Sequence, residues 1–385
     1  MHATKGSIHV RNIADTIARM ARAGAPTPRD TVPSRLTPLT EFGTNPGALL
    51  GYGYVPRDLP SGAALVVVLH GCTQTAAGYD HGSGWSKLAD RAGFALLFPE
   101  QTRANNPNRC FNWFASEDTA QAGGEAESIA QMTETMIARH GLDRSRVYVT
   151  GLSAGGAMTV AMLATRPDLF AGGAVIGGLA YGTATGVSQA LDRMRGHGDT
   201  SDVALADAVR SGSRGHDGRW PTLAIWHGGA DATVSVANAD TIARQWRGIH
   251  GVDATAVRTE RIGTAVHRIW SDAQGRDVVE DWTVPGMGHG TPIDPLRGER
   301  LGVAGPFMLD VGISSTAVIA KSWGLVAAAK AETAAEAAAK PAPVERVAKI
   351  AIPVSPKPAP KPRANAPAGI QATIENALRA AGLMR

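Results

Sequence analysis

The stretch Val147-Tyr148-Val149-Thr150-Gly151-Leu152-Ser153-Ala154-Gly155-Gly156 decides how the rest of the chain is interpreted. A short β-branched run ends in Gly-x-Ser-x-Gly, and residues 157–163 have helix-forming composition, so strand, sharp turn and helix follow without a gap. A serine hydroxyl is a weak nucleophile, so it must stand on a strained, exposed turn where a histidine can accept its proton. An ordinary glycine-rich turn is the alternative, and the flanking strand and helix favour a nucleophile at Ser153.

This strand, turn and helix match the nucleophile elbow of the α/β-hydrolase fold. Gly151 and Gly155 leave out side chains that would crowd the turn, and the following helix points backbone N–H groups toward developing negative charge. Buried-strand patterns recur along the chain, at residues 64–69, 94–99, 172–178 and 220–228. Helical patterns separate them, at residues 85–93, 125–140 and 236–248. The alternation predicts one mainly parallel central sheet flanked by helices.

Changes in composition divide the chain into four parts. We expect an N-terminal arm with a possible amphipathic helix at 1–45 and a single α/β-hydrolase catalytic domain at 46–326. An Ala/Lys/Pro-rich flexible linker follows at 327–368, and a short C-terminal helix at 369–385. Residues 182–219 are polar and glycine-rich, which predicts an insertion over the carboxyl ends of the strands, where α/β folds bind ligands.

Composition narrows the class of protein. The 385 residues are 44% hydrophobic and 19% charged, with a net charge of +4 that lies largely in the tails, so nucleic-acid binding is disfavoured. No apolar run approaches the roughly 18 residues of a transmembrane segment, and residues 1–24 lack the apolar core of a signal peptide. The two cysteines cannot form a metal cluster unaided, and we expect neither metal nor cofactor.

A catalytic triad in this fold follows the chain order Ser, acid, His. Asp231 stands just past the strand at 220–228, and His289 stands between two glycines after a later strand, as the acid and the base require. His289 would accept the proton of Ser153, while Asp231 would orient the imidazole and stabilise the imidazolium. Other carboxylates and histidines are interpreted as surface or supporting residues: His197, Asp202, His216, Asp217, His227, His250 and His267.

The oxyanion hole needs one backbone N–H from the residue after the nucleophile and one from the loop after an early strand. Ala154 supplies the first. Cys72 is the favoured second donor, with Thr73 as the alternative. Trp113 lies in a loop of polar Asn residues, so it is either a core side chain or a substrate-binding wall of the cleft.

Several segments together resemble the poly(3-hydroxybutyrate) depolymerase family of esterases over roughly residues 50–295. They are His70-Gly71-Cys72-Thr73-Gln74, Pro99-Glu100-Gln101, Asn108-Arg109-Cys110-Phe111-Asn112-Trp113-Phe114, Gly151-Leu152-Ser153-Ala154-Gly155-Gly156-Ala157-Met158 and His227-Gly228 with Asp231. The resemblance implies a serine carboxylic-ester hydrolase that acts through an acyl-enzyme on polyhydroxyalkanoate or its oligomers. Feruloyl or acetyl esters of carbohydrates and small esters are the alternative substrates.

The resemblance also implies secretion, whereas the unrecognised signal peptide favours the cytoplasm. The alternative from a different class is a non-catalytic protein that binds polymer granules. Weak contact of the terminal helices with a polymer or membrane surface is a related expectation. Ser, Asp and His in the required order argue for the enzyme.

Cys72 and Cys110 match the cysteine pair of the resembled family. Each follows a predicted strand of the parallel sheet, so both loops emerge at its carboxyl edge, close enough for a disulfide. Two buried thiols are the alternative, since a reducing cytosol would keep both cysteines in the thiol form.

Overall fold

The structure is a computed structural model that describes residues 34–326. The possible helix of the N-terminal arm, the linker at 327–368 and the short helix at 369–385 lie outside the described residues.

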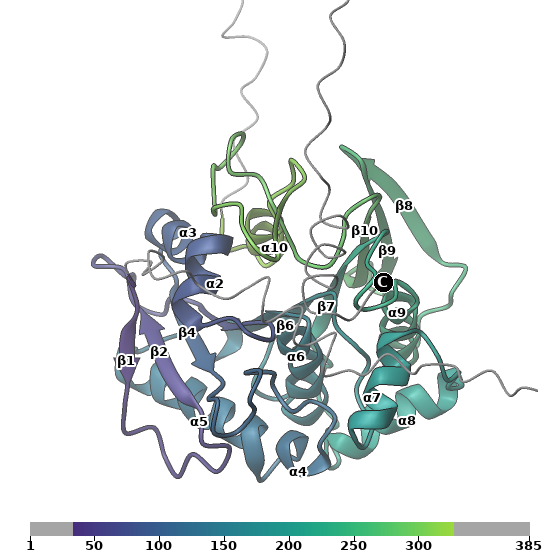
Figure 1. The fold of residues 1–385 in the computed structure, drawn as a ribbon, viewed down its shortest axis with the longest axis horizontal. Helices are drawn as coiled ribbons and strands as arrows, with labels where there is room; N and C mark the ends of the chain where they lie inside the picture. The colour runs from purple at the N-terminus through teal and green to yellow at the C-terminus, as the bar shows by residue number, and fades with distance from the viewer. Residues whose placement is uncertain (1–33, 327–385) are drawn as a thin grey trace, which may run out of the picture. The chain divides into compact units, whose positions relative to one another are not determined.

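A ten-stranded sheet forms the centre of the described part (Figure 1). Its order is β1-β2-β4-β3-β5-β6-β7-β10-β9-β8. The strands are β1 (Thr37–Leu39), β2 (Leu50–Tyr54), β3 (Leu65–Leu69), β4 (Ala95–Glu100), β5 (Val147–Leu152), β6 (Gly172–Ile176), β7 (Thr222–Gly228), β8 (Val257–Ile262), β9 (Ala265–Ser271) and β10 (Asp277–Val284). The central pairs from β4 to β10 are parallel and the outer pairs are antiparallel. The predicted mainly parallel sheet is confirmed.

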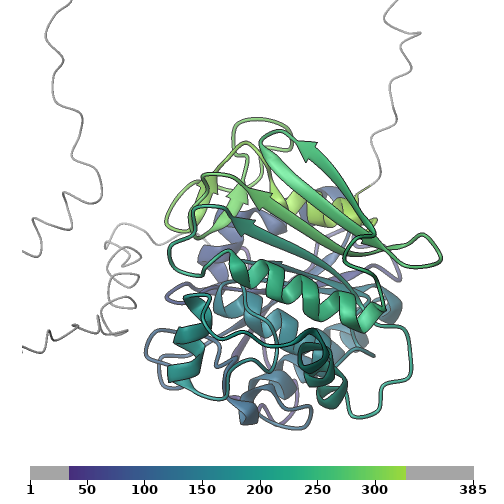
Figure 2. The same ribbon diagram turned by 90° about the vertical axis from the view of Figure 1, so that its right-hand side faces the viewer.

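Helices cover both faces of this sheet. They are α2 (Ala76–Ser83), α3 (Trp85–Ala92), α4 (Ser116–Thr119), α5 (Gly124–His140), α6 (Ala154–Thr165), α7 (Val187–Met194), α8 (Asp202–Gly212), α9 (Ala237–His250) and α10 (Ser315–Ser322). A second, two-stranded parallel sheet pairs β11 (Thr291–Ile293) with β12 (Met308–Asp310). Figure 2 shows the same arrangement from the side on which α8 and α9 pack together. Among these helices, none has the length and apolar character that crossing a bilayer requires.

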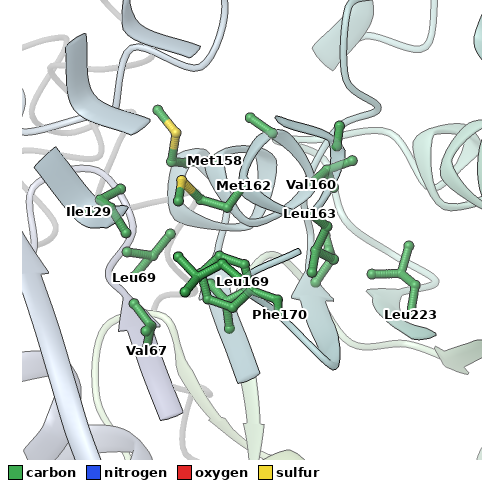
Figure 3. Close-up of a cluster of buried hydrophobic side chains, with 14 of the residues drawn as sticks. Val67, Leu69, Ile129, Met158, Val160, Met162, Leu163, Leu169, Phe170 and Leu223 are labelled. Atoms are coloured by element: carbon green, nitrogen blue, oxygen red, sulfur yellow. The ribbon is translucent and has the colours of Figure 1, made fainter. Parts of the chain in front are cut away.

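The sheet separates two apolar clusters, because successive side chains of a strand point to opposite faces. Leu65, Val67 and Leu69 of β3 join the cluster under α5, α6 and α9, whereas Val66 and Val68 join the cluster under α2, α3 and α10. Figure 3 shows α6 laid against the first of these faces. Both sets are fully buried, which is why β3 reads as a continuous apolar run rather than an alternating one.

The outer strands differ from expectation. The sheet begins with β1, before residue 46, where the catalytic domain was expected to start. β1 escaped prediction because it has three residues and includes Pro38, which weakens a strand pattern. β8 escaped it because all six of its residues are exposed, so it carries no apolar alternation.

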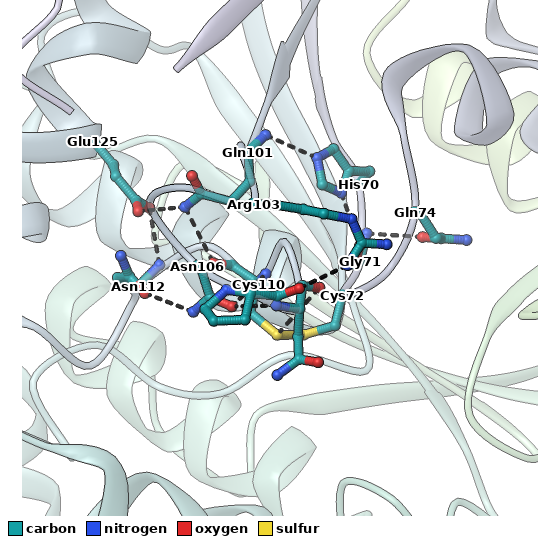
Figure 4. Close-up of a disulfide and its surroundings, with 12 residues drawn as sticks. His70, Gly71, Cys72, Gln74, Gln101, Arg103, Asn106, Cys110, Asn112 and Glu125 are labelled. Atoms are coloured by element: carbon teal, nitrogen blue, oxygen red, sulfur yellow. Dashed lines mark hydrogen bonds between the residues drawn. A yellow bond between two sulfur atoms is a disulfide. The ribbon is translucent and has the colours of Figure 1, made fainter. Parts of the chain in front are cut away.

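A disulfide ties two loops together at the carboxyl edge of the sheet. Cys72 follows β3, Cys110 lies in the long loop after β4, and their Cα atoms are 4.2 Å apart (Figure 4). The Thr73 N–H also donates to the Asn108 carbonyl at 2.6 Å. Because β3 and β4 are parallel neighbours, both loops leave the sheet on the same side.

A buried network of hydrogen bonds holds the long loop after β4 in place. The Gln101 side-chain amide donates to the Cys110 carbonyl at 3.1 Å and to the Glu125 carboxyl group at 2.5 Å. The Asn112 N–H donates to the other Glu125 oxygen at 2.9 Å. Burial raises the pKa of Glu125 to about 8, against the opposing effect of the hydrogen bond from Asn112. Glu125 at the start of α5 is therefore a protonated anchor for the loop at neutral pH.

The disulfide should stabilise the fold measurably. Replacing both Cys72 and Cys110 with Ala removes a link that spans 38 residues, which should lower the free energy of unfolding by about 3–4 kcal/mol on the chain-entropy model. Urea unfolding of both proteins measures the difference. Dithiothreitol should lower the free energy of unfolding of the wild type to that of the variant, and it should leave the value of the variant unchanged. Equal stability without reductant would contradict the expectation.

Glu125 should make stability depend on pH. Its pKa rises from the ordinary 4.5 to about 8 on folding, so the folded state keeps a proton that the unfolded state loses between these values. Stability from this group is therefore complete below pH 4.5 and is lost as pH rises through 8. Between pH 4.5 and 8, the melting temperature of Glu125→Gln should decline less steeply than that of the wild type. Glu117→Gln, at an exposed position, is the control and should follow wild type. Parallel curves for Glu125→Gln and wild type would rule out the buried proton.

Candidate active site

Ser153 stands at a strained turn between β5 and α6. Its backbone angles are φ 58° and ψ −118°, a conformation that residues with a Cβ rarely adopt. The turn is held because the Ser153 N–H donates to the Ile176 carbonyl at 2.8 Å and the Ser153 carbonyl accepts from Ala157 at 2.9 Å. The side chain is thereby set at the carboxyl edge of the sheet, as in a nucleophile elbow.

Two glycines permit this turn. A Cβ on Gly155 would lie 2.5 Å from the carbonyl oxygens of Leu69 and His70, and one on Gly151 would lie 2.4 Å from the Gly155 carbonyl oxygen. These neighbours are backbone atoms, which cannot rotate away as a flexible side chain can. Any larger residue at either position would push α6 away from β3.

Asp231 and His289 meet beside the neighbouring strand ends. Asp231 follows β7, His289 follows β10, and β7 and β10 are parallel partners. The Asp231 Oδ2 and His289 Nδ1 atoms are 2.7 Å apart, and both side chains are almost fully buried. Ser153 and His289 line one narrow space of about 10 Å³ together with Cys72 and Phe307, close to the smallest volume that holds a water molecule.

Hydrogen bonds keep Asp231 ionised. Burial by itself would raise the pKa of Asp231, but the hydrogen bond from His289 and the attraction of that ring outweigh burial. The backbone N–H groups of Thr233 and Val234 also donate to Oδ1, at 2.8 and 2.9 Å. The net result is a pKa below its ordinary value, so a charged carboxylate faces the imidazole.

His227 supports the acid from the strand itself. It is buried at the end of β7, its Nε2 lies 2.9 Å from the Val234 carbonyl, and the same nitrogen is 3.5 Å from Asp231 Oδ2. Burial lowers the pKa of His227, which favours the neutral ring. His227 therefore braces the turn that carries Asp231.

The competing polar residues are engaged elsewhere. Asp202 pairs with Arg244, His267 bonds to Glu280, and Asp217 is exposed after α8. His197 is exposed as well, while His216 and His250 approach the backbone carbonyls of Arg219 and Pro221.

Ala154 and Cys72 line the same cavity as Ser153. Ala154 is the first residue of α6, where helix N–H groups have no partner within the helix. Cys72 lies in the turn after β3, and within residues 34–326 its N–H has no hydrogen-bond partner. The Thr73 N–H, by contrast, is already donated to Asn108. Of the two candidates after β3, Cys72 has the available donor.

His70 holds the turn that carries Cys72. Its Nδ1 lies 2.8 Å from the Gly71 carbonyl, and its Nε2 accepts from the Gln101 N–H at 3.1 Å. Burial lowers the pKa of His70 to about 4, so the ring is neutral and can accept that hydrogen bond. The ring thus joins the turn after β3 to the loop after β4.

A cavity of about 340 Å³ opens beside Ser153. Trp113 and Phe114 form one wall, and Trp113 also packs on the small apolar cluster of Ala157, Leu179 and Val234. Trp113 therefore contacts the core and lines the cavity, and its role in binding substrate stays a prediction. The volume is at the lower end of the roughly 300–1,000 Å³ typical of small-molecule sites.

The insertion also lines the cavity, through α7. Its apolar residues line the cavity: Val187, Ala190, Leu191 and Met194. Their spacing of three, one and three residues places them on one face of a helix. That pattern could have identified α7 in the sequence, where the segment was interpreted only as part of a polar, glycine-rich insertion. α8, the second helix of the insertion, packs instead against α9.

Groups of His, Cys, Asp and Glu that could hold a metal ion do not occur among residues 34–326.

Comparison with known proteins identifies relatives of this arrangement. A model of the family described as "Esterase PHB depolymerase" matches residues 54–268. Poly(3-hydroxyalkanoate) depolymerase C of Paucimonas lemoignei is 45% identical over 292 residues, which cover 76% of this chain and 70% of that protein. Acetylxylan esterase A of Emericella nidulans is 32% identical, over 69% of this chain and 88% of that one.

A solved structure agrees with these relatives. The acetyl xylan esterase from Aspergillus awamori superposes with a TM-score of 0.65 at 28% identity, covering 76% of this chain and 99% of its own. Its fold and the mainly parallel sheet described above bear out an α/β-hydrolase. The chain belongs to the Esterase PHB depolymerase family and is a carboxylic-ester hydrolase.

Proposed function

We propose that this chain hydrolyses the ester bonds of polyhydroxyalkanoates, in particular poly(3-hydroxybutyrate) or its oligomers, through an acyl-enzyme on Ser153. The observation that carries the mechanism is the 2.7 Å contact between Asp231 and His289 at the space that Ser153 also lines. The 45% identity to a poly(3-hydroxyalkanoate) depolymerase supports the substrate class.

In the first half of the reaction, Ser153 Oγ attacks the ester carbonyl while His289 Nε2 accepts the hydroxyl proton. The Nδ1 atom of the ring keeps its hydrogen bond to Asp231, whose negative charge stabilises the imidazolium that forms. His289 then gives the proton to the departing alcohol oxygen. The acyl group remains on Ser153.

In the second half, a water molecule replaces the alcohol. His289 removes a proton from this water as it attacks the acyl carbonyl, and the proton passes to Ser153 Oγ when the ester to the enzyme breaks. The space of about 10 Å³ between Ser153 and His289 is where such a water would approach. The products are a carboxylic acid and the free enzyme.

Negative charge develops on the carbonyl oxygen in both halves. The N–H groups of Cys72 and Ala154 would donate to it, and Ala154 lies at the positive end of the α6 dipole. Both donors are backbone groups, fixed by the disulfide on one side and the helix on the other. They need little rearrangement when the charge forms.

The cavity wall favours a polyester over a sugar. A hydroxyalkanoate chain carries alkyl groups and ester oxygens but few hydroxyl groups, which suits the apolar face of α7 and Trp113. A carbohydrate ester would bring hydroxyl groups that need partners. Asn106, Asn108 and Thr233 also line the cavity, so acetyl or feruloyl carbohydrate esters remain the alternative.

We also propose that the enzyme works outside the cytoplasm. The disulfide between Cys72 and Cys110 supports this, because such bonds persist in oxidising compartments. Its position next to an oxyanion donor would make the enzyme dependent on that environment.

A substrate panel tests the proposed function. Wild type should release acid from poly(3-hydroxybutyrate) and from hydroxybutyrate oligomers faster than from acetylated xylan or feruloyl sugars, measured by titration at constant pH. Ser153→Ala should reduce turnover on every active ester by about 10⁴–10⁶-fold, because the nucleophile is lost without loss of core volume. More than a tenth of wild-type activity in this variant would exclude Ser153, and a preference for the carbohydrate esters would exclude the polyester.

The acid of the triad has its own test. Asp231→Asn should lower kcat by about 10⁴-fold, since a neutral amide cannot stabilise the imidazolium and favours the wrong ring tautomer. Asp217→Asn, at an exposed site, should change kcat less than twofold. Steady-state rates on p-nitrophenyl butyrate compare the two. Similar losses in both variants would show that Asp231 is not the acid.

A further inference from the structure

Arg195 is the one ionisable side chain among the described residues that line the 340 Å³ cavity. It directly follows α7, whose apolar face forms the wall of that cavity. The other lining side chains are apolar, amide or hydroxyl groups, together with the disulfide. A single positive charge in such surroundings attracts an anionic group on a ligand that is otherwise apolar.

The charge of Arg195 is not used by the fold. Its guanidinium group approaches Asp192 at 3.5 Å, with the two side chains 48% and 55% exposed, and it makes no hydrogen bond within the described residues. Exposed pairs of this kind contribute about 0–1 kcal/mol. Arg193, two residues earlier, shows the contrast, because its guanidinium donates to the carbonyls of Thr183 and His197 and so holds the insertion together.

We infer that Arg195 binds the free carboxylate at the end of a hydroxyalkanoate oligomer, an inference that rests on the proposed function. Guanidinium is suited to carboxylate because its planar N–H groups can donate two parallel hydrogen bonds. The rest of the ligand, with its alkyl groups, packs on α7 and Trp113. The volume of the cavity fits a short chain end rather than a long segment of polymer.

The direction of the chain follows from the chemistry of the ligand. In an oligomer of hydroxy acids, the free carboxylate always lies on the alcohol side of every ester bond. An oligomer bound through its carboxylate therefore places its leaving group in this cavity and its acyl group on the other side of Ser153. The cavity beside α7 is the leaving-group subsite, and the product that departs from it is a free hydroxy acid.

Competition against a neutral substrate tests this inference. The probes are the 3-hydroxybutyrate dimer as free acid and as methyl ester, each used to inhibit hydrolysis of p-nitrophenyl butyrate. Wild type should bind the free acid more tightly than the methyl ester. Arg195→Gln should weaken binding of the acid by about tenfold and change binding of the ester less than twofold, as measured by their inhibition constants.

Asp192→Asn is the matched control, since it removes the partner of Arg195 and does not line the cavity. It should leave the affinity for the acid unchanged or increase it, whereas a merely structural effect would weaken both probes in both variants. Equal inhibition of wild type by acid and ester, or equal weakening of both probes by Arg195→Gln, would overturn the inference. The assay does not depend on polyester turnover, so failure of the proposed substrate class is seen separately, as inactivity on oligomers in the panel above.

Discussion

The close approach of two backbone segments under Ser153 is the constraint on which the site depends. Gly155 lies against the carbonyls of Leu69 and His70, so the first turn of α6 touches the end of β3 with no side chain between them. This contact brings the start of α6, with Ala154, next to the end of β3, from which the turn with Cys72 follows. The nucleophile and both proposed oxyanion donors are thus positioned by one packing contact, and the strain at Ser153 is retained because the surrounding sheet leaves the turn no alternative.

The parallel centre of the sheet explains why residues far apart in sequence meet. β3, β5, β7 and β10 all run in the same direction, so the segments that follow them emerge at one edge. Each of these segments contributes one part of the site: Cys72, Ser153, Asp231 and His289. The loop after β4, tied to the loop after β3 by the disulfide and supported by Glu125, carries Trp113 into the lining of the cavity. The parallel direction of these strands therefore brings the four residues to one edge of the sheet.

Sequence reasoning succeeded where burial and chain order control the outcome. The continuous apolar runs of β3 and β4 predicted central strands because both faces of those strands are buried, and the order Ser, acid, His selected residues that the fold gathers at one edge. It left open what depends on contacts between distant segments. His227 was predicted only as a surface or supporting residue, and its contact with the turn that carries Asp231 is visible only in the structure. Cys72 was favoured over Thr73, and the hydrogen bond from Thr73 to Asn108, which no local pattern reveals, supports that order.

The two edge strands of the sheet affect whether copies of the protein associate with one another. A strand at the edge of a sheet offers unpaired backbone groups to any passing chain, and long apolar edges promote aggregation. β1 is three residues long and contains Pro38, which has no N–H to offer. β8 is longer, but Arg258, Glu260 and Arg261 are all exposed along it, and charged side chains on an edge strand disfavour the addition of another strand. An enzyme that gathers at high local concentration on an insoluble ester would in this way be protected from polymerising edge to edge with its neighbours.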